Sequence, residues 1–124
     1  MRDGKRLILH VDDDPDVLQT VRLVLEKAGY AVQTALSAEE GLRAYKAEAP
    51  DFVLVDLMME EIDAGTNLVK ELKLAGNRAP IYLLSGMGDQ LNLAINYRDL
   101  GLDGVLQKPV DFNVLLSTLK AKIV

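Results

Sequence analysis

Acidic, hydroxyl and basic side chains at four places in this sequence could together carry out phosphoryl-group chemistry. Three consecutive aspartates occupy residues 12–14, and Asp56, Ser85 and Lys108 each follow a separate apolar run. Carboxylate oxygens are suitable ligands for Mg²⁺, and a carboxylate is also a nucleophile toward phosphorus. A lysine and a hydroxyl can stabilise the charge that develops on phosphoryl oxygens. This chemistry requires elements that bring the four places together.

Five short apolar runs, separated by segments long enough for helices, predict the strands of a parallel sheet. The first, third and fourth runs are almost continuously apolar, which is typical of strands covered by helices on both faces, so we expect them at the sheet centre. The runs occupy residues 7–11, 31–35, 52–55, 81–84 and 104–106.

The intervening segments carry their own helix signals. Asp14 is a candidate N-cap for a helix over residues 15–28, which Gly29 closes. Ser37 and Glu40 have the spacing of a capping box, in which each side chain satisfies the other's backbone amide. Apolar residues at helical spacing predict three further helices, through Leu68, Leu72 and Ala75 before Gly76, through Leu93, Tyr97 and Leu100 before Gly101, and through Phe112, Leu115, Leu116, Leu119 and Ile123 after Asp111.

The alternation of strands and helices predicts a single α/β domain over residues 1–124. Right-handed crossovers favour a (βα)5, flavodoxin-like three-layer sandwich with a parallel five-stranded sheet in the order 2-1-3-4-5. In such sheets ligands bind at the carboxyl ends of the strands, near the point where strand order reverses. The candidate residues all follow predicted strands, so we expect them to meet at that edge.

At that edge Asp12, Asp13 and Asp56 would repel one another by kilocalories in a poorly solvated cleft. A divalent cation relieves the repulsion, and Mg²⁺ suits a site of few carboxylates that leaves positions for phosphate oxygens. Asp56 could then form an aspartyl-phosphate, with Lys108 sharing the developing charge and Ser85 donating a hydrogen bond to a phosphoryl oxygen.

Composition limits the other functions. The net charge of -5 disfavours direct nucleic-acid binding by this domain. The chain has no cysteine, which excludes disulfides, thiolate metal sites and cysteine nucleophiles. The apolar runs are too short to span a membrane and the first residues lack a secretory signal, so we expect a cytoplasmic protein.

The arrangement resembles the receiver domains of two-component response regulators, through residues 8–15, 51–59, 84–86 and 108–109. The resemblance implies that Asp13 and Asp56 bind Mg²⁺ directly, Asp12 through water and Met58 through its backbone carbonyl. It makes Asp56 the phosphoacceptor, Ser85 the switch hydroxyl and Lys108 the phosphate-binding lysine. The implied phosphodonor is a sensor histidine kinase or phosphotransfer protein. The implied output is a shift between two conformations that alters the face of the fourth helix, fifth strand and fifth helix, where a downstream protein or effector domain binds.

Several residues depart from the family's pattern. Glu60 and Glu61 stand where proline and glycine are usual, and Ala64 stands where a second glycine is common. Val105 replaces a frequent tyrosine or phenylalanine, so an aromatic-rotamer readout is not expected. Met58 and Met87 replace polar residues that influence water access, which predicts slow self-dephosphorylation.

Two other function classes remain as alternatives. One is a receiver-like interaction module that works without phosphorylation, and the retained acidic, serine and lysine residues argue against it. The other is a flavodoxin-like nucleotide or flavin binder, which the absence of a glycine-rich loop after the first strand disfavours. We interpret Asp14 as a helix cap, and His10 as a packed, hydrogen-bonded residue of the first strand with no functional role.

Overall fold

Five parallel strands form one sheet in the order β2-β1-β3-β4-β5, which confirms the predicted topology. They belong to a computed structural model that describes residues 4–56, 64–85 and 102–123. The strands are β1 (Leu7–Val11), β2 (Ala31–Ala35), β3 (Phe52–Asp56), β4 (Ile81–Ser85) and β5 (Gly104–Gln107), and the helices are α1 (Pro15–Lys27), α2 (Ala38–Ala47), α3 (Ala64–Leu74) and α5 (Phe112–Lys122).

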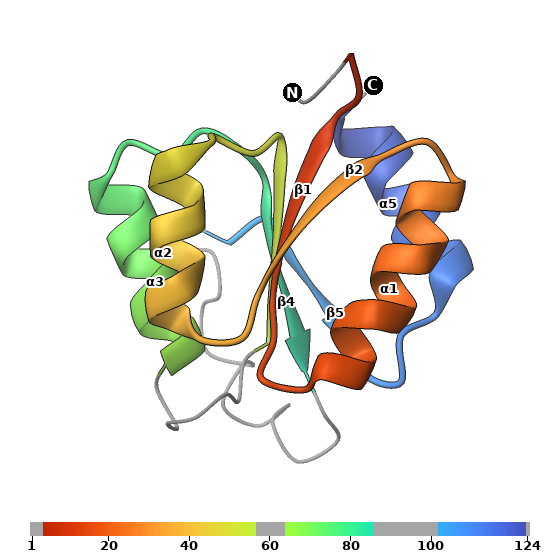
Figure 1. The fold of residues 1–124 in the computed structure, drawn as a ribbon, viewed down its shortest axis with the longest axis horizontal. Helices are drawn as coiled ribbons and strands as arrows, with labels where there is room; N and C mark the ends of the chain where they lie inside the picture. The colour runs from red at the N-terminus through yellow and green to blue at the C-terminus, as the bar shows by residue number, and fades with distance from the viewer. Residues whose placement is uncertain (1–3, 57–63, 86–101, 124) are drawn as a thin grey trace.

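The described helices cover both faces of the sheet and make a three-layer sandwich. Figure 1 shows α2 and α3 on one side of the sheet and α1 and α5 on the other. Alternate residues of β1 point to opposite faces, so Leu9 and Val11 pack in the core beneath α2 and α3, whereas Ile8 packs in the core with residues of α1 and α5. None of the helices in the described ranges has the length and apolar composition needed to cross a membrane.

The sheet register aligns the strand ends that carry the candidate residues. Every residue of β1, β3 and β4 is buried, as the continuous apolar runs predicted for the sheet centre. Val11 pairs with Val55, Asp56 with Leu84, and Ser85 with Gln107. Because these strands are parallel, the segments that follow β1, β3, β4 and β5 emerge at one edge of the sheet.

Local caps fix the direction in which the chain leaves that edge. The Asp14 side chain accepts a hydrogen bond from the Asp16 amide and caps α1, as predicted. In α2 the Glu40 amide donates to Ser37 Oγ at 3.1 Å, but Glu40 Oε2 accepts from the amide of Leu36 rather than from that of Ser37. One bond of the predicted capping box is therefore present. In the other, the amide that donates to Glu40 belongs to the residue before Ser37. The predicted helix through Leu93, Tyr97 and Leu100 lies outside the described residues.

Gly104 makes room for an aromatic ring in the core between the sheet and helices α1 and α5. Tyr82 pairs with Gly104 across β4 and β5, and its ring stacks on Phe52 with centroids 5.3 Å apart. A methyl group at residue 104 would come within 2.5 Å of Tyr82 Cε2. The ring is buried, so it cannot move away without disturbing its stacking partner.

We therefore expect Gly104→Ala to lower the free energy of unfolding by about 1–3 kcal/mol, because it overpacks a closed part of the core. Urea denaturation would measure the loss. In a Tyr82→Leu background the clash is absent, so the same glycine substitution should cost clearly less. If Gly104→Ala lowered the free energy of unfolding equally in both backgrounds, contact with the Tyr82 ring would not be the reason that residue 104 must be glycine.

Candidate functional site

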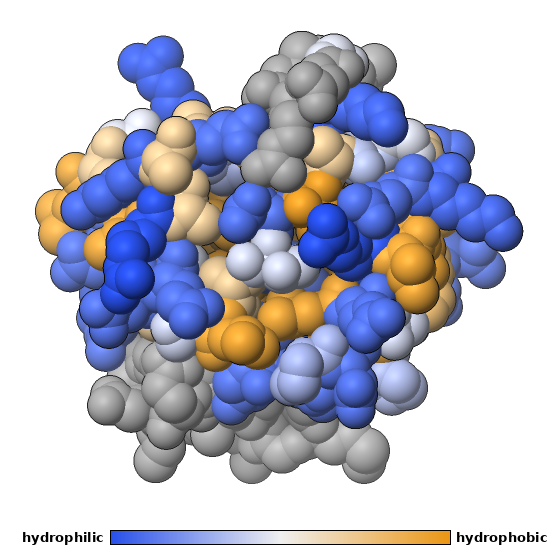
Figure 2. All heavy atoms as spheres, in the orientation of Figure 1, coloured by the Kyte–Doolittle hydropathy of each residue, from blue (hydrophilic) through white to orange (hydrophobic). Residues whose placement is uncertain are grey.

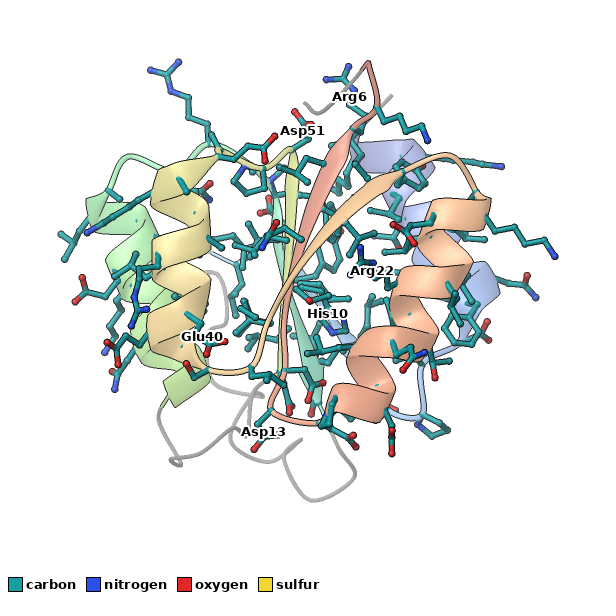
Figure 3. The ribbon with its side chains drawn as sticks, in the orientation of Figure 1. Arg6, His10, Asp13, Arg22, Glu40 and Asp51 are labelled. Atoms are coloured by element: carbon teal, nitrogen blue, oxygen red, sulfur yellow. The ribbon has the colours of Figure 1, made fainter. Side chains whose placement is uncertain are left out.

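Three aspartates converge at the carboxyl ends of β1 and β3. Each of Asp12, Asp13 and Asp56 offers a carboxylate oxygen, and these three oxygens lie within 4.8 Å of one another. Asp12 and Asp56 are buried, with 0% and 3% of their surface exposed, whereas Asp13 is exposed. The labelled Asp13 lies at the end of the sheet opposite Asp51 in Figure 3. The cluster thus has two enclosed carboxylates and one that faces solvent.

Backbone contacts hold Asp12 at the end of β1. Its amide donates to the carbonyl of Ala35 at 3.0 Å, which extends the pairing with β2 by one residue. Its Oδ1 accepts a hydrogen bond of 2.9 Å from the Asp14 amide as the chain turns into α1. The second oxygen, Oδ2, is buried and has no hydrogen-bond partner in the part of the chain that the structure describes. One oxygen of Asp12 is therefore fixed and the other is left for an electrostatic contact.

Lys108 reaches this cluster from the end of β5. Its Nζ lies 3.1 Å from Asp56 Oδ1 and 3.6 Å from Asp12 Oδ2. The first contact is a charge-assisted hydrogen bond, and the second is too long for a hydrogen bond and is purely ionic. The Lys108 amide also donates to the carbonyl of Ser85 at 2.8 Å, which fixes the lysine backbone beside β4.

The environment of Lys108 keeps its side chain charged. Partial burial by itself lowers the pKa of Lys108, but the hydrogen bond and charge of Asp56 and the charge of Asp12 raise it, and the net pKa lies above the usual value. The ammonium is therefore retained at every physiological pH. With three carboxylates against one ammonium, the group still has an excess of negative charge.

Ser85 ends β4 and is 1% exposed. Its position next to Gln107 in the sheet, and the bond from the Lys108 amide to its carbonyl, place it beside the lysine. The structure thus brings Asp12, Asp13, Asp56 and Lys108 into direct proximity and puts Ser85 at the neighbouring strand end. Met58, Glu60, Glu61 and Met87, which the sequence also singles out, lie outside the described residues.

His10 is a neighbour of this site that the sequence interpretation gave no role. It is buried, as expected, but neither ring nitrogen has a hydrogen-bond partner within the described ranges, which corrects the expectation of a hydrogen-bonded residue. Its Nε2 lies 3.9 Å from Asp12 Oδ2. Burial, with a smaller effect of the Lys108 charge, lowers the pKa of His10 to about 3, so the ring is neutral. The signal in the sequence was a polar residue two positions before a site aspartate, and therefore on the same side of the strand.

The donor set fits a hard divalent cation. All three candidate ligands are carboxylates, the class of oxygen donor that Mg²⁺ prefers. The buried Oδ2 of Asp12 has no hydrogen-bond donor within residues 4–56, 64–85 and 102–123, and the described charges of the cluster are more negative than positive. A bound cation would give Asp12 Oδ2 a positively charged partner and would neutralise part of the excess negative charge. Because Asp13 is exposed, a cation could enter the site from the solvent on that side.

The crowding of the carboxylates predicts a stability effect of Asp13→Asn. Without metal, this change removes one of three repelling charges, so we expect the free energy of unfolding to rise by roughly 1 kcal/mol in a chelator. Excess Mg²⁺ should stabilise the wild type more than the variant, because the variant has lost a ligand charge. Urea unfolding with and without Mg²⁺ measures both effects. Asp16→Asn, at an exposed aspartate on α1, is the matched control and should show neither.

Two surface grooves lie on the same side of the sheet as α1, and only one of them adjoins the cluster. The remote groove, of about 490 Å³, runs along α1 and the edge strand β2 and includes Leu23 and Leu36, both exposed. Figure 2 shows apolar patches on this face among hydrophilic residues. The other groove, of about 330 Å³, lies between α1 and the segment after β5, and Lys108 forms part of its wall. Its remaining lining residues are Asp16, Val17, Thr20, Val21, Pro109, Val110 and Phe112.

Known proteins have sequences similar to that of this chain. The family model for the response regulator receiver domain matches residues 8–120. The chain is 37% identical over 112 residues to the transcriptional regulatory protein GlrR of Escherichia coli (strain K12), covering 90% of this chain and 25% of GlrR. It is 30% identical over 114 residues to the alkaline phosphatase synthesis transcriptional regulatory protein PhoP of Bacillus subtilis, covering 92% of this chain and 47% of PhoP. The chain thus spans about a quarter to a half of these curated relatives.

Solved structures agree with the sequence matches. A response regulator receiver domain protein from Clostridium thermocellum superposes with a TM-score of 0.85 at 32% identity, covering 95% of this chain and 94% of that one. The chemotaxis protein CheY4 of Vibrio cholerae superposes with a TM-score of 0.87 at 27% identity, covering 97% of this chain and 100% of that one. The similarity therefore extends over nearly the whole chain in both comparisons.

Proposed function

Because the chain belongs to the response-regulator receiver family, we propose that it is a signalling switch that accepts a phosphoryl group on Asp56 in a Mg²⁺-dependent reaction. Receiver domains are signalling modules of two-component systems and not metabolic enzymes. The observation that carries the proposal is the contact of 3.1 Å between Lys108 Nζ and the buried Asp56, inside a cluster of three carboxylates. This combination supplies a nucleophile and a fixed positive charge within one enclosed site.

In this proposal Asp12, Asp13 and Asp56 hold Mg²⁺, with the backbone carbonyl of Met58 as a further ligand. When bound, the cation would neutralise charge on the carboxylates and on the incoming phosphoryl oxygens. Asp12 lies close to Lys108, and its Oδ1 accepts a hydrogen bond from the Asp14 amide. Asp56, whose Oδ1 contacts Lys108, would direct a carboxylate oxygen at the donor.

The proposed donor is a phosphohistidine on a sensor histidine kinase or phosphotransfer protein. An oxygen lone pair of Asp56 forms the new O–P bond while the P–N bond to the donor imidazole breaks. The departing ring nitrogen keeps the electron pair of that bond and takes a proton from solvent. Lys108 and the Ser85 hydroxyl then stabilise the negative oxygens of the aspartyl-phosphate.

The apolar groove beside Lys108 supports approach of a donor protein from the side of α1. Val17, Val110 and Phe112 give this groove an apolar lining next to the site. A protein surface that covers it would bury apolar area and exclude water from the neighbouring cluster. The proposed output face includes β5 and α5, where Val105 is half-buried and Val114 is exposed, and a downstream protein or effector domain binds there. A cytoplasmic location without direct nucleic-acid contact is part of the same proposal.

Incubation of the protein with Mg²⁺ and a small acyl-phosphate donor tests the function. We expect intact-mass analysis to detect one added phosphoryl group per chain, bound as an alkali-labile acyl phosphate. A chelator should prevent the addition. A protein that never gains this group, although it is folded and supplied with Mg²⁺, would contradict the proposal and favour the alternative of a phosphorylation-independent interaction module.

A further inference from the structure

His10 is a buried polar residue in a strand that is otherwise apolar up to the acidic cluster. It lies on the same face of β1 as Ile8 and Asp12, because successive side chains of a strand alternate. Its sheet neighbours are Thr34 on β2 and Leu54 on β3. Figure 3 shows the labelled His10 on the α1 side of the sheet. The ring is 0% exposed, so water does not satisfy its nitrogens from the surface.

Two unsatisfied polar groups face each other at this point. Both nitrogens of His10 and Oδ2 of Asp12 lack hydrogen-bond partners among the described residues. The Nε2 atom of the ring lies 3.9 Å from Oδ2. A buried donor and a buried acceptor are each costly when unpaired, and a movement of about 1 Å would bring this pair to hydrogen-bond distance.

Asp12 Oδ2 has Lys108 as its other close polar neighbour in the described part of the chain, at 3.6 Å. The lysine is shared, because its shorter contact of 3.1 Å is with Asp56. If Asp56 carries a phosphoryl group, the added negative charge draws Lys108 further from Asp12. The buried Oδ2 then loses its lysine partner. A bound cation would occupy only part of its acceptor capacity, because a carboxylate oxygen has two lone pairs, and a position remains for a nearby donor.

We propose that His10 is a positioning residue whose Nε2–H donates a hydrogen bond to Asp12 Oδ2, and so holds Asp12 when Lys108 turns to the phosphoryl group. The inference rests on the proposed function for the role of Lys108, but the hydrogen bond itself does not. A neutral imidazole donates from one nitrogen only, so Nε2 carries the proton and Nδ1 does not.

His10 is the single histidine of the chain, so its ring can be observed without overlap by ¹⁵N NMR of the full protein. We expect the neutral Nε2–H form with a slowly exchanging ring proton, whose signal shifts when Asp12 is changed to asparagine. A ring protonated on Nδ1 alone, or a rapidly exchanging Nε2 proton, would overturn the inference. This measurement needs neither metal nor phosphorylation.

The positioning role is tested with beryllium fluoride as a phosphoryl analogue in excess Mg²⁺. We expect His10→Leu, which keeps the side-chain volume but has no donor, to bind the analogue about tenfold more weakly. His10→Gln, whose amide can reach Asp12, should recover most of the affinity. Ile8→Val, on the same face of β1, is the packing control and should bind as the wild type does.

The outcomes separate the two proposals. Equal affinities for wild type, His10→Leu and His10→Gln would reject the positioning role. A wild type that neither binds the analogue nor accepts a phosphoryl group would reject the proposed function. The NMR measurement would still test the hydrogen bond between His10 and Asp12. Loss of affinity in His10→Leu with rescue by His10→Gln supports the role, because a purely structural effect on packing would not depend on a hydrogen-bond donor.

Discussion

Asp56→Asn is expected to reduce phosphoryl incorporation from an acyl-phosphate donor by more than about a thousandfold, because the amide oxygen is a poor nucleophile toward phosphorus. The substitution preserves the shape of the side chain and removes its charge. Incorporation is measured by intact mass after incubation with Mg²⁺. The residue pairs with Leu84 at the end of β3 and is 3% exposed, so we expect the fold around it to be retained.

Glu71→Gln is the matched control, because Glu71 is exposed on α3 and lies outside the cluster of three carboxylates. It should be phosphorylated as fast as the wild type. Asp13→Asn should be slower than the wild type but not inactive, because the acceptor oxygen of Asp56 remains. Labelling of the folded Asp56→Asn protein at a rate similar to that of the wild type would show that another residue accepts the phosphoryl group.

The topology could be predicted from the sequence because its causes are local and repeated. Continuous apolar runs identified β1, β3 and β4 as central strands, and the handedness of crossovers fixed the strand order. The cap at Asp14 was also predictable, since an aspartate directly before Pro15 is a typical helix start, and its side chain accepts from the Asp16 amide. Once the strand order is known, residues that follow different strands must meet at one edge of the sheet.

Finer features of the site depend on distances that a sequence does not contain. Glu40 accepts from Leu36 rather than Ser37 because the path of the chain into α2 determines which amide is in reach. Consecutive aspartates have different environments, since Asp12 is enclosed at the strand end while Asp13 faces solvent. The missing partners of His10 likewise depend on side-chain placement across three elements. Periodicity predicts that His10 is buried, but not that it lies 3.9 Å from a carboxylate oxygen that has no hydrogen-bond partner among the described residues.

The burial of His10 has a second consequence, which is a loss of stability in mild acid. Burial lowers its pKa in the folded protein to about 3, whereas its value in an unfolded chain is 6.5. Between these values the unfolded state binds a proton that the folded state does not bind. The contribution to stability is therefore fully present above pH 6.5 and is lost as the pH falls toward 3. From pH 6.5 to about 4.5 the expected loss is roughly 2 kcal/mol, at 1.36 kcal/mol for each full pH unit.

His10→Leu removes this titration, so its free energy of unfolding should fall less than that of the wild type over the same interval. Urea denaturation in a chelator measures the difference without a contribution from metal binding. Ile8→Val loses packing on the same face of β1, and its effect should be independent of pH. Parallel pH profiles for wild type and His10→Leu would mean that the folded protein accepts the proton, and hence that the ring is far less enclosed than the structure describes.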